Sequence, residues 1–310
     1  MEPKDIRQVS LKFASGASIP VLGFGAGTAW YLGPEGNSDG HAVNRPFVDS
    51  IKTAFKLGFT HLDNALMYGN EEDAGVAIKE YLAESGKKRE DIFVTTKVWT
   101  EEIADIPASL RGSLKRLGLD YVDLFLIHAP FFGSVGLAGK VTVASAWKQM
   151  EQVKDAGLAK EIGVSNFRVS DFDEIFASKP KYTPAINQLE CNPYLPQTEL
   201  LAYHASHGIL TASYSPLLPL VKPLGSLPSI LADIAKSHGA TTGQVLLAWN
   251  LAKRNVVITT SSREERLKEY LDVGKVELTE EEVGRIDEAG KETPYREYWT
   301  DPGEFEPLKK

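Results

Sequence analysis

The sequence predicts a closed (β/α)8 barrel, or TIM barrel, with an N-terminal β-hairpin and an extra C-terminal helix and tail. Two observations predict this fold. Short apolar runs alternate with amphipathic stretches along all 310 residues. Several of the runs are almost continuous in Val, Ile, Leu and Phe, which is typical of parallel strands covered on both faces. Eight such alternations favour a barrel, and a doubly wound sheet is the competing interpretation.

The first expected strand follows a hairpin-like pair in residues 9–23, which turns at a Ser-Gly-Ala sequence. After this strand, residues 28–47 form a long Gly- and Asn-rich loop that we expect to overhang the mouth of the barrel. The eight expected strands are residues 21–28, 59–65, 91–99, 121–130, 159–167, 184–193, 210–217 and 256–262.

Helical segments are expected between the strands because apolar residues recur there at spacings of three and four. Gly86 is suited to end the first clear one, and Thr279 with the glutamates after it predicts a capped start for the last. No internal repeat or linker interrupts the pattern, so residues 1–310 are expected to form a single domain. The clearest segments are residues 71–85, 145–156, 229–238, 244–254 and 279–290, with another around Leu267 and Tyr270.

Composition argues against several classes of function. The net charge of −8 and the pI near 5.4 argue against a nucleic-acid partner, and the scattered Lys and Arg residues form no membrane-binding segment. The single cysteine, Cys191, excludes an intramolecular disulfide and is expected to be a buried structural thiol. We find no signal peptide and no run of about 18 apolar residues. We therefore expect a cytoplasmic protein, either a monomer or a weak dimer.

Ionisable residues concentrate where the expected strands end, which is where the active sites of such barrels lie. Asp63 closes the second strand, Lys97 lies near the end of the third, and His128 ends the fourth. If these faces point into the barrel, side-chain alternation places the three residues on one rim. Tyr68 lies in the loop that follows Asp63.

These four side chains suit one reaction. A lysine at the top of an apolar barrel needs Asp63 as a partner. A tyrosine beside the ammonium should ionise more easily than its free pKa of about 10 allows, and a nearby imidazole can donate to or accept from the same oxygen. The set predicts that Tyr68 is a general acid for an oxygen gaining negative charge, as in hydride addition to a carbonyl. The alternative is a buried Lys–Asp pair with unrelated neighbours.

Two segments resemble motifs of the aldo-keto reductase family. Residues 161–167 (EIGVSNF) match the second motif without a gap, and residues 58–75 (GFTHLDNALMYGNEEDAG) resemble the first, although Thr60 and Asn64 depart from the usual Arg and Thr. The resemblance covers nearly the whole chain, implies a barrel reductase and removes the doubly wound alternative. It fills all four positions of the family's catalytic tetrad, which are Asp63, Tyr68, Lys97 and His128.

The resemblance also implies a nicotinamide dinucleotide across the barrel mouth, bound without a Rossmann loop. Its contacts fall at strand ends, and an aromatic side chain there suits stacking on the flat nicotinamide ring. The residues implied are Ser165, Asn166 and Gln188 for the carboxamide, Tyr214 for ring stacking, Ser215 and Leu217 for the pyrophosphate, and Thr28.

At the adenosine end the sequence departs from the family pattern. Many members carry Ile-Pro-Lys-Ser…Arg after the eighth strand, where the Lys and Arg hold a 2′-phosphate. Here Thr260 stands at the lysine position, whereas Ser261 and Arg266 remain in register. Arg263 supplies a second guanidinium, which suits a phosphate or is a solvated first-turn residue. We therefore expect NADPH rather than NADH.

An aromatic and largely apolar mouth is expected for the substrate, a small carbonyl compound. Such a mouth suits cyclic or α-dicarbonyl substrates better than sugars. Residues 27–31 (GTAWY) and the Ser-Ser-Arg run at 261–263 are similar to fungal members that reduce α-keto amides, ketopantoyl lactone and conjugated polyketones. The connection at 131–143 is short compared with many relatives, which implies an open pocket. The expected pocket residues are Trp30, Trp99, Phe131 and Trp299.

Three alternatives stay open. One is an aldose- or xylose-type reductase, and another is a cofactor-binding family member without catalysis, against which the complete tetrad argues. A phosphate-handling isomerase or aldolase would need a Gly-rich loop after strands seven and eight, where this sequence has aromatic and hydroxyl residues. No metal is expected, because the remaining histidines lack metal-binding spacing and are interpreted as core or surface residues. They are His41, His61, His204, His207 and His238.

Overall fold

The computed structural model describes residues 5–33, 36, 42–132, 141–301, 303–305 and 308. Eight parallel strands close into a barrel in the order β10-β3-β4-β5-β6-β7-β8-β9, so the predicted fold is confirmed. A separate antiparallel hairpin pairs β1 (Ser10–Lys12) with β2 (Ser18–Pro20). The barrel strands are β3 (Leu22–Gly25), β4 (His61–Asp63), β5 (Phe93–Val98), β6 (Val122–Ile127), β7 (Ala159–Ser165), β8 (Ile186–Glu190), β9 (Leu210–Tyr214) and β10 (Val256–Thr259).

Each strand is shorter than its apolar run predicts, and after several strands the run continues into a buried connecting segment. Ala129 after β6 and Cys191 after β8 are fully buried without belonging to a strand. Apolar periodicity therefore located every strand and overestimated its length. This matters for the site, because the predicted functional residues lie at these junctions.

The expected helices are also observed, and residues 71–85 coincide with α2. Several of the other helices begin or end one or two residues from their expected bounds. In addition, α1 begins at Arg45, inside the segment expected to be loop through residue 47. The Asn44 side chain accepts from the Phe47 N–H, and Pro46 occupies the first turn, so capping decides the start. The helices are α1 (Arg45–Leu57), α2 (Glu71–Ser85), α3 (Ile106–Leu117), α4 (Val143–Asp155), α5 (Val169–Ala177), α6 (Thr198–Ser206), α7 (Leu218–Val221), α8 (Leu227–His238), α9 (Thr242–Ala252), α10 (Glu264–Leu271) and α11 (Glu280–Lys291).

Short 3-10 helices occupy several connections between these elements. They are η1 (Ile6–Gln8), η2 (Thr28–Trp30), η4 (Leu66–Tyr68), η5 (Arg89–Asp91), η6 (Thr100–Asp105) and η7 (Asp272–Lys275). Two of them carry predicted site residues, because η2 contains Thr28 and Trp30 and η4 ends at Tyr68.

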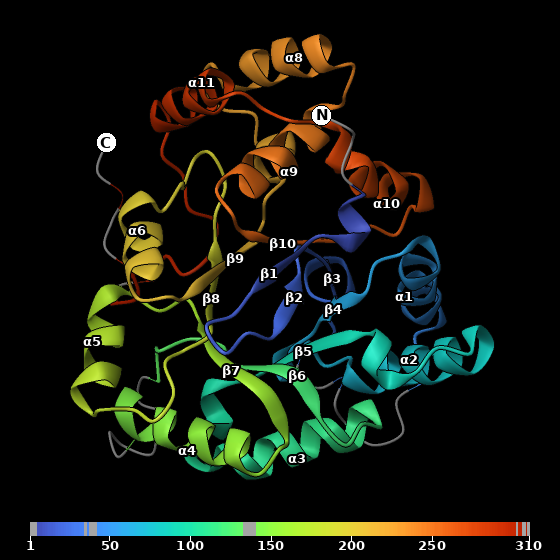
Figure 1. Ribbon diagram of the computed structural model, residues 1–310, viewed down its shortest axis with the longest axis vertical. Coiled ribbons are helices and arrows are strands. Elements are labelled where there is room, and N and C mark those ends of the chain that lie inside the picture. The colour runs from blue at the N-terminus through green and yellow to red at the C-terminus, as the bar shows by residue number, and fades with distance from the viewer. Residues whose placement is uncertain are drawn as a thin grey trace. The chain divides into compact units, whose positions relative to one another are not determined.

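The chain divides into two compact units. One, which we call the Lys97 unit, contains residues 23–187 and 260–264, and in it helices α1 to α5 lie outside strands β4 to β7 (Figure 1). Helices α2 and α3 approach closely at Gly75, where a Cβ atom would lie 2.7 Å from the carbonyl oxygens of Arg116 and Leu117. Only glycine allows this packing.

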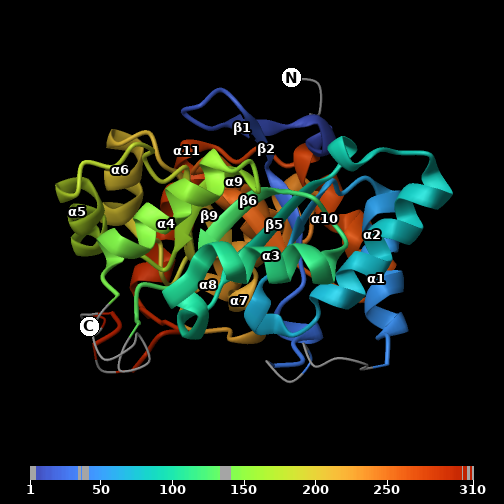
Figure 2. The same ribbon diagram turned by 90° about the horizontal axis from the view of Figure 1, so that it is seen from below.

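The second unit, which we call the Tyr214 unit, contains residues 1–22, 188–259 and 265–310. Within it, the β1–β2 hairpin and helix α7 lie at opposite ends (Figure 2). The predicted extra C-terminal helix is α11, which packs against α8. Trp249 of α9 donates to Asp287 of α11 at 2.8 Å, which ties the extra helix to the unit's core.

The described residues contain neither a membrane-crossing helix nor a metal-binding cluster. In that part of the chain no helix combines the length and apolarity needed to cross a bilayer. The same part holds no group of three or more His, Cys, Asp or Glu residues placed to bind a metal ion.

Candidate active site

Three neighbouring strands bring the predicted tetrad together in the Lys97 unit. Asp63 is the last residue of β4, Lys97 lies one residue before the end of β5, and His128 follows β6 directly. The His128 N–H donates to the Val98 carbonyl at 3.0 Å, which continues the ladder past the strand. Because parallel strands end on the same edge, the side chains converge as expected.

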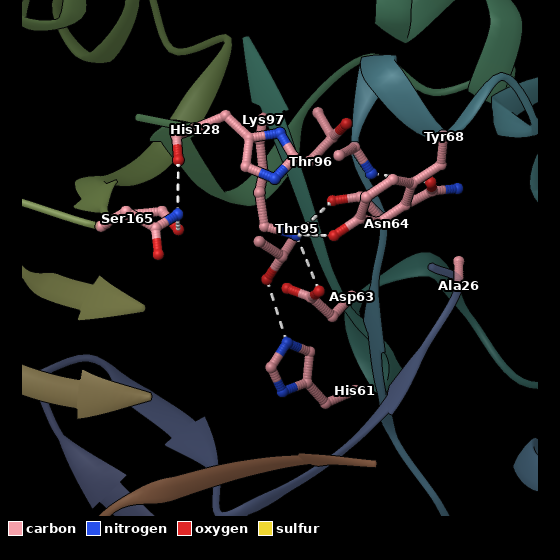
Figure 3. Close-up of polar contacts among 12 residues, drawn as sticks. Ala26, His61, Asp63, Asn64, Tyr68, Thr95, Thr96, Lys97, His128 and Ser165 are labelled. Carbon is pink, nitrogen blue, oxygen red and sulfur yellow. Dashed lines mark hydrogen bonds and ion pairs between the residues drawn. The ribbon is translucent and has the colours of Figure 1, made fainter. Parts of the chain in front are cut away.

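Lys97 is the centre of this group. Its side chain is fully buried, and its ammonium donates to Asp63 Oδ2 at 2.7 Å, to the Asn64 carbonyl at 2.8 Å and to Tyr68 Oη at 3.3 Å (Figure 3). All three N–H groups of the ammonium therefore have acceptors. Burial lowers the pKa of Lys97, and the Asp63 carboxylate opposes that effect.

Two glycines help to position Tyr68, one beside its ring and one in the turn that follows it. It ends η4, and Gly69 follows in a left-handed conformation with φ of 71°. A Cβ at Gly69 would lie 1.8 Å from the Gly33 carbonyl oxygen, so no other residue fits. At Gly27 a Cβ would lie 3.1 Å from the Tyr68 ring. The backbone thus leaves space for the phenol and fixes the turn that presents it.

His128 completes the tetrad as a neutral imidazole. Its ring lies edge-on to Tyr68, with centroids 5.6 Å apart, and edge-on to Trp99 at 5.1 Å. Burial holds the pKa of His128 well below its ordinary value, and the Lys97 charge acts in the same direction. Its Nδ1 is buried without a hydrogen-bond partner among the described residues. Tyr68 is therefore better suited than His128 to give up a proton near neutral pH.

A second polar pair lies inside the barrel next to the tetrad. His61 and Thr95 precede Asp63 and Lys97 by two residues on their strands, so they share the same inward faces. His61 Nε2 lies 3.0 Å from Thr95 Oγ1 (Figure 3). His61 is 1% exposed, which agrees with its interpretation as a core residue.

Trp30, a predicted pocket residue, is held through its backbone. Asn70, which is fully buried, donates from Nδ2 to the carbonyls of Ala26 at 2.9 Å and Trp30 at 2.8 Å. The Trp30 ring packs on Phe47 with centroids 5.3 Å apart. Its indole Nε1 is buried and finds no hydrogen-bond partner in the described part of the chain, so this N–H is a candidate donor to a ligand.

Among the predicted cofactor residues of the Lys97 unit, Ser165 and Asn166 are buried, whereas Asn166 and Thr28 have left-handed backbone. Ser165 ends β7, and Asn166 follows with φ of 61°. The Asn166 amide donates to the His128 carbonyl at 2.9 Å and to Ser165 Oγ at 3.0 Å. Thr28 also has positive φ, 51°. Left-handed backbone in residues other than glycine is costly and gathers at functional sites.

The predicted phosphate-binding segment begins after β10. Ser261 Oγ accepts from the Arg263 N–H at 3.1 Å, and the Ser261 carbonyl accepts from Ser50 Oγ at 3.2 Å. Arg263 is exposed just before α10, and Arg266 is exposed within it. Both guanidinium groups are thus presented at the surface near a helix N-terminus.

In the Tyr214 unit, the predicted stacking residue is tied to the C-terminal tail. Tyr214 ends β9, and its hydroxyl accepts from Trp299 Nε1 at 3.1 Å. The Tyr298 ring lies edge-on to Tyr214 at 5.8 Å. Ser215 and Trp299 have φ of 53° and 60°. Gln188 lies within β8, two residues before the strand ends at Glu190, and Leu217 is half-buried.

Sequence reasoning missed the residues that attach this tail. The carboxylate of Glu190 accepts the N–H groups of Glu297 and Tyr298 at 3.1 Å. Lys222 bonds Tyr295, and its ammonium lies 2.5 Å from the Glu297 carboxylate. A carboxylate inside an apolar strand was the available signal for Glu190, whereas its main-chain partners carry no side-chain pattern.

The other predicted residues have mixed outcomes. The Arg168 guanidinium lies 5.2 Å from the centre of the Phe131 ring. Cys191 is buried as expected, and burial raises the pKa of its thiol to about 12. Residues 34–35, 37–41 and 133–140 lie outside the described residues. The expectations for His41, for the overhanging loop and for the shortness of the 131–143 connection therefore fall partly or wholly outside the described structure.

Comparison with known proteins shows which protein family this chain resembles. The chain matches the model of the Aldo/keto reductase family over residues 22–222 and 225–291. It is 41% identical over 281 residues to an aldo-keto reductase of Mycolicibacterium vanbaalenii, covering 90% of this chain and 91% of that protein. It is 36% identical over 282 residues to an NAD/NADP-dependent indole-3-acetaldehyde reductase of Schizosaccharomyces pombe, with 89% and 94% covered.

Solved structures of similar fold belong to the same family. An aldo/keto reductase from Brucella melitensis superimposes with a TM-score of 0.76 at 32% identity, covering 91% of this chain and 99% of that one. A Bombyx mori aldo-keto reductase in complex with NADP gives 0.76 at 29% identity, with 90% and 92% covered. Fold and relatives together define an oxidoreductase that uses a nicotinamide cofactor. The chain belongs to the aldo-keto reductase family.

Proposed function

We propose that this enzyme reduces an aldehyde or ketone to the alcohol with NADPH, and that Tyr68 protonates the carbonyl oxygen. The observation that carries the proposal is the chain of contacts from Asp63 to the Lys97 ammonium, 2.7 Å, and from there to the Tyr68 hydroxyl, 3.3 Å. An acid poised in this way suits an oxygen that gains negative charge.

When bound, a nicotinamide cofactor would supply the hydride that the carbonyl carbon receives. The carbonyl oxygen then takes the phenolic proton of Tyr68, and the resulting phenolate is stabilised by the Lys97 ammonium beside it. Asp63 keeps Lys97 charged in a fully buried position. His128, being neutral, orients the carbonyl by a hydrogen bond without adding charge. A proton from solvent returns Tyr68 to its starting state.

The residues present fit a nicotinamide. Ser165 and Asn166 are a buried hydroxyl and a buried amide, 1% and 2% exposed, and Gln188 is a second buried amide at 3%. Such groups offer both donors and acceptors, which a carboxamide requires. Tyr214 has a half-buried ring whose hydroxyl is already fixed by Trp299. These residues would bind and orient the ring.

NADPH is proposed over NADH because Arg263, Arg266 and Ser261 together suit a 2′-phosphate. Thr260 replaces the lysine of many relatives, and its Oγ1 is buried without a hydrogen-bond partner among the described residues. The Bombyx mori structure contains NADP, whereas the Schizosaccharomyces pombe relative is named for both cofactors. Comparing kcat/KM for NADPH and NADH tests the proposal, and a preference for NADH would contradict it.

The proposed substrates are small α-dicarbonyls, α-keto lactones or α-keto amides. The support is the similarity of residues 27–31 and 261–263 to fungal members with such substrates, together with the aromatic residues Trp30, Trp99, Phe131 and Trp299. The alternative is an aldose- or xylose-type reductase. The name of the Schizosaccharomyces pombe relative adds a third chemistry, an aryl acetaldehyde.

One experiment separates these possibilities. NADPH oxidation should be followed with ketopantoyl lactone, isatin, diacetyl, indole-3-acetaldehyde and xylose as substrates. The proposal expects the highest kcat/KM among the first three, and a highest value for xylose would favour the alternative. NADPH binding with no turnover on any substrate would identify a non-catalytic family member. We further propose a cytoplasmic monomer or weak dimer without nucleic-acid or membrane partners, which sedimentation and localisation would test.

A further inference from the structure

Glu71 carries a buried carboxylate that has no role in the proposed reaction. It is the first residue of α2 and has no exposed surface. Its Oε1 accepts from Thr96 Oγ1 at 2.6 Å, and its Oε2 accepts from Arg116 Nε at 2.8 Å, with Arg116 Nη2 at the same distance. One carboxylate therefore joins helix α2, strand β5 and helix α3.

The carboxylate is close to both members of the Tyr68–Lys97 pair along the chain. Thr96 directly precedes Lys97 on β5, and the two side chains leave opposite faces of the strand (Figure 3). On the other side, Glu71 follows Tyr68 by three residues, across Gly69 and the buried Asn70. Glu71 thus contacts the outer face of the strand whose inner face carries the lysine.

We propose that Glu71 is a positioning residue whose negative charge acts through strand β5 on the Tyr68–Lys97 pair, with Arg116 balancing that charge. This inference rests on the proposed function of Tyr68 as the proton donor. Charges act strongly in such an interior because the effective dielectric constant is low. The Glu71 charge raises the pKa of Lys97, in the same direction as Asp63 and against burial.

Charged and titratable groups of the described residues lie on both sides of strand β5. Asp63, Tyr68 and His128 face Lys97 from the inside of the barrel. Arg116 of α3 contacts Glu71 from the outside, and desolvation raises the pKa of Glu102 of η6. A buried ion pair adds little net stability compared with well-packed apolar groups. The property to test is therefore the effect of the Glu71 charge on the Tyr68–Lys97 pair, and not its contribution to stability.

Two substitutions should shift the alkaline midpoint of the pH profile of kcat in opposite directions. Glu71→Gln keeps an acceptor for Thr96 or Arg116 but removes a negative charge. Without that negative charge the Tyr68–Lys97 pair loses its proton at a lower pH. The alkaline midpoint of the pH profile of kcat should therefore fall by about one pH unit. Arg116→Gln removes a positive charge and should raise that midpoint. Glu80→Gln, on the same helix but paired with Arg45 and Lys52 at the surface, should leave it unchanged.

The measurement is the pH profile of kcat, with Tm recorded for each variant. Opposite shifts in the two variants support the inference. If kcat and Tm fall while the alkaline midpoints of both variants stay unchanged, Glu71 only holds α2 in place. That result would overturn the inference. If E71Q does not fold, the sign of the R116Q shift decides. Tyr68→Phe is measured alongside, because activity in that variant would refute the proposed function itself, whereas an inactive Y68F with unmoved midpoints refutes only the role of Glu71.

Discussion

The tetrad and the tail cluster around Tyr214 are held by different kinds of interaction. In the Lys97 unit, Lys97 and Asp63 are 0% and 3% exposed and are joined by a charged hydrogen bond. In the Tyr214 unit, half-buried Tyr214 and Trp299 share one neutral hydrogen bond. Charged hydrogen bonds inside a protein are stronger and more strongly coupled than neutral ones near solvent. Substitutions in the first region should therefore change the chemistry, and substitutions in the second should change binding.

The largest expected effect is in the tetrad. Tyr68→Phe removes the proposed proton donor and should lower kcat by about 10³-fold, within the range of general acid catalysis. Because Lys97 acts through Tyr68, the double variant Y68F/K97M should lose no more than the worse single variant. Steady-state kinetics give kcat, and quenching of tryptophan fluorescence by NADPH gives an affinity that should stay nearly constant in Y68F. Additive losses would show that the two residues act independently.

A second test concerns a buried histidine of the Tyr214 unit, His204. His204 of α6 bonds Thr211 at 2.9 Å, and burial lowers its pKa to about 4 from an ordinary 6.5. The folded pKa lies below the unfolded one, so the unfolded state binds the proton first. The stability contribution of neutral His204 is therefore complete above pH 6.5 and is lost as pH falls to about 4. His128 shifts in the same direction in the Lys97 unit.

The acid loss attributable to His204 amounts to about 3 kcal/mol, because its pKa is lowered from 6.5 to about 4 and each tenfold change in a proton affinity corresponds to about 1.4 kcal/mol. His204→Asn keeps a partner for Thr211 and cannot titrate, so its unfolding free energy should fall less between neutral and acid pH. Urea unfolding at several pH values measures this. Parallel curves for wild type and variant would show that the pKa of His204 is the same in the folded and unfolded states, and would contradict the prediction.

A smaller effect is expected in the tail cluster. Trp299→Phe keeps an aromatic ring but removes the donor to the Tyr214 hydroxyl. A neutral hydrogen bond contributes about 1 kcal/mol, so the Kd for NADPH should rise about fivefold while kcat changes little. Tyr203→Phe, on α6, is the matched control. A fall in kcat with unchanged Kd would place Trp299 with the chemistry and break the contrast between the two regions.

The smallest effect concerns a departure from the family motif. Asn64 Oδ1 accepts from the Ala65 N–H at 2.7 Å, but Asn64 Nδ2 is buried with no hydrogen-bond partner in the described structure. A lost donor of this kind costs about 1 kcal/mol or more. Asn64→Thr, the usual family residue, should raise Tm by about 2 °C and leave kcat within about twofold, because the carbonyl that binds Lys97 remains. A lower Tm would show that the amide has a partner.

Much of the site could be predicted because its residues occupy fixed positions relative to the strands. Asp63, Lys97 and His128 each lie where an apolar run ends, and parallel strands bring such ends together. The Asn64 carbonyl and the N–H groups bound by Glu190 could not be predicted in this way, because every residue has them. The start of α1 was misplaced because a cap at Asn44 outweighed the loop-like composition around it.

Sequence periodicity and motif spacing by themselves determined the barrel, its hairpin and extra helix, and the meeting of the four predicted tetrad residues. The reason is that the alternation of apolar runs dictates which surfaces must be buried. Only the tertiary structure decided that Lys97 has three acceptors, that Glu190 and Lys222 attach the tail, and that Glu71 meets Arg116 45 residues away. The physical reason is that buried polar groups must find partners where packing brings them. In this chain, packing brings them together from segments far apart in sequence.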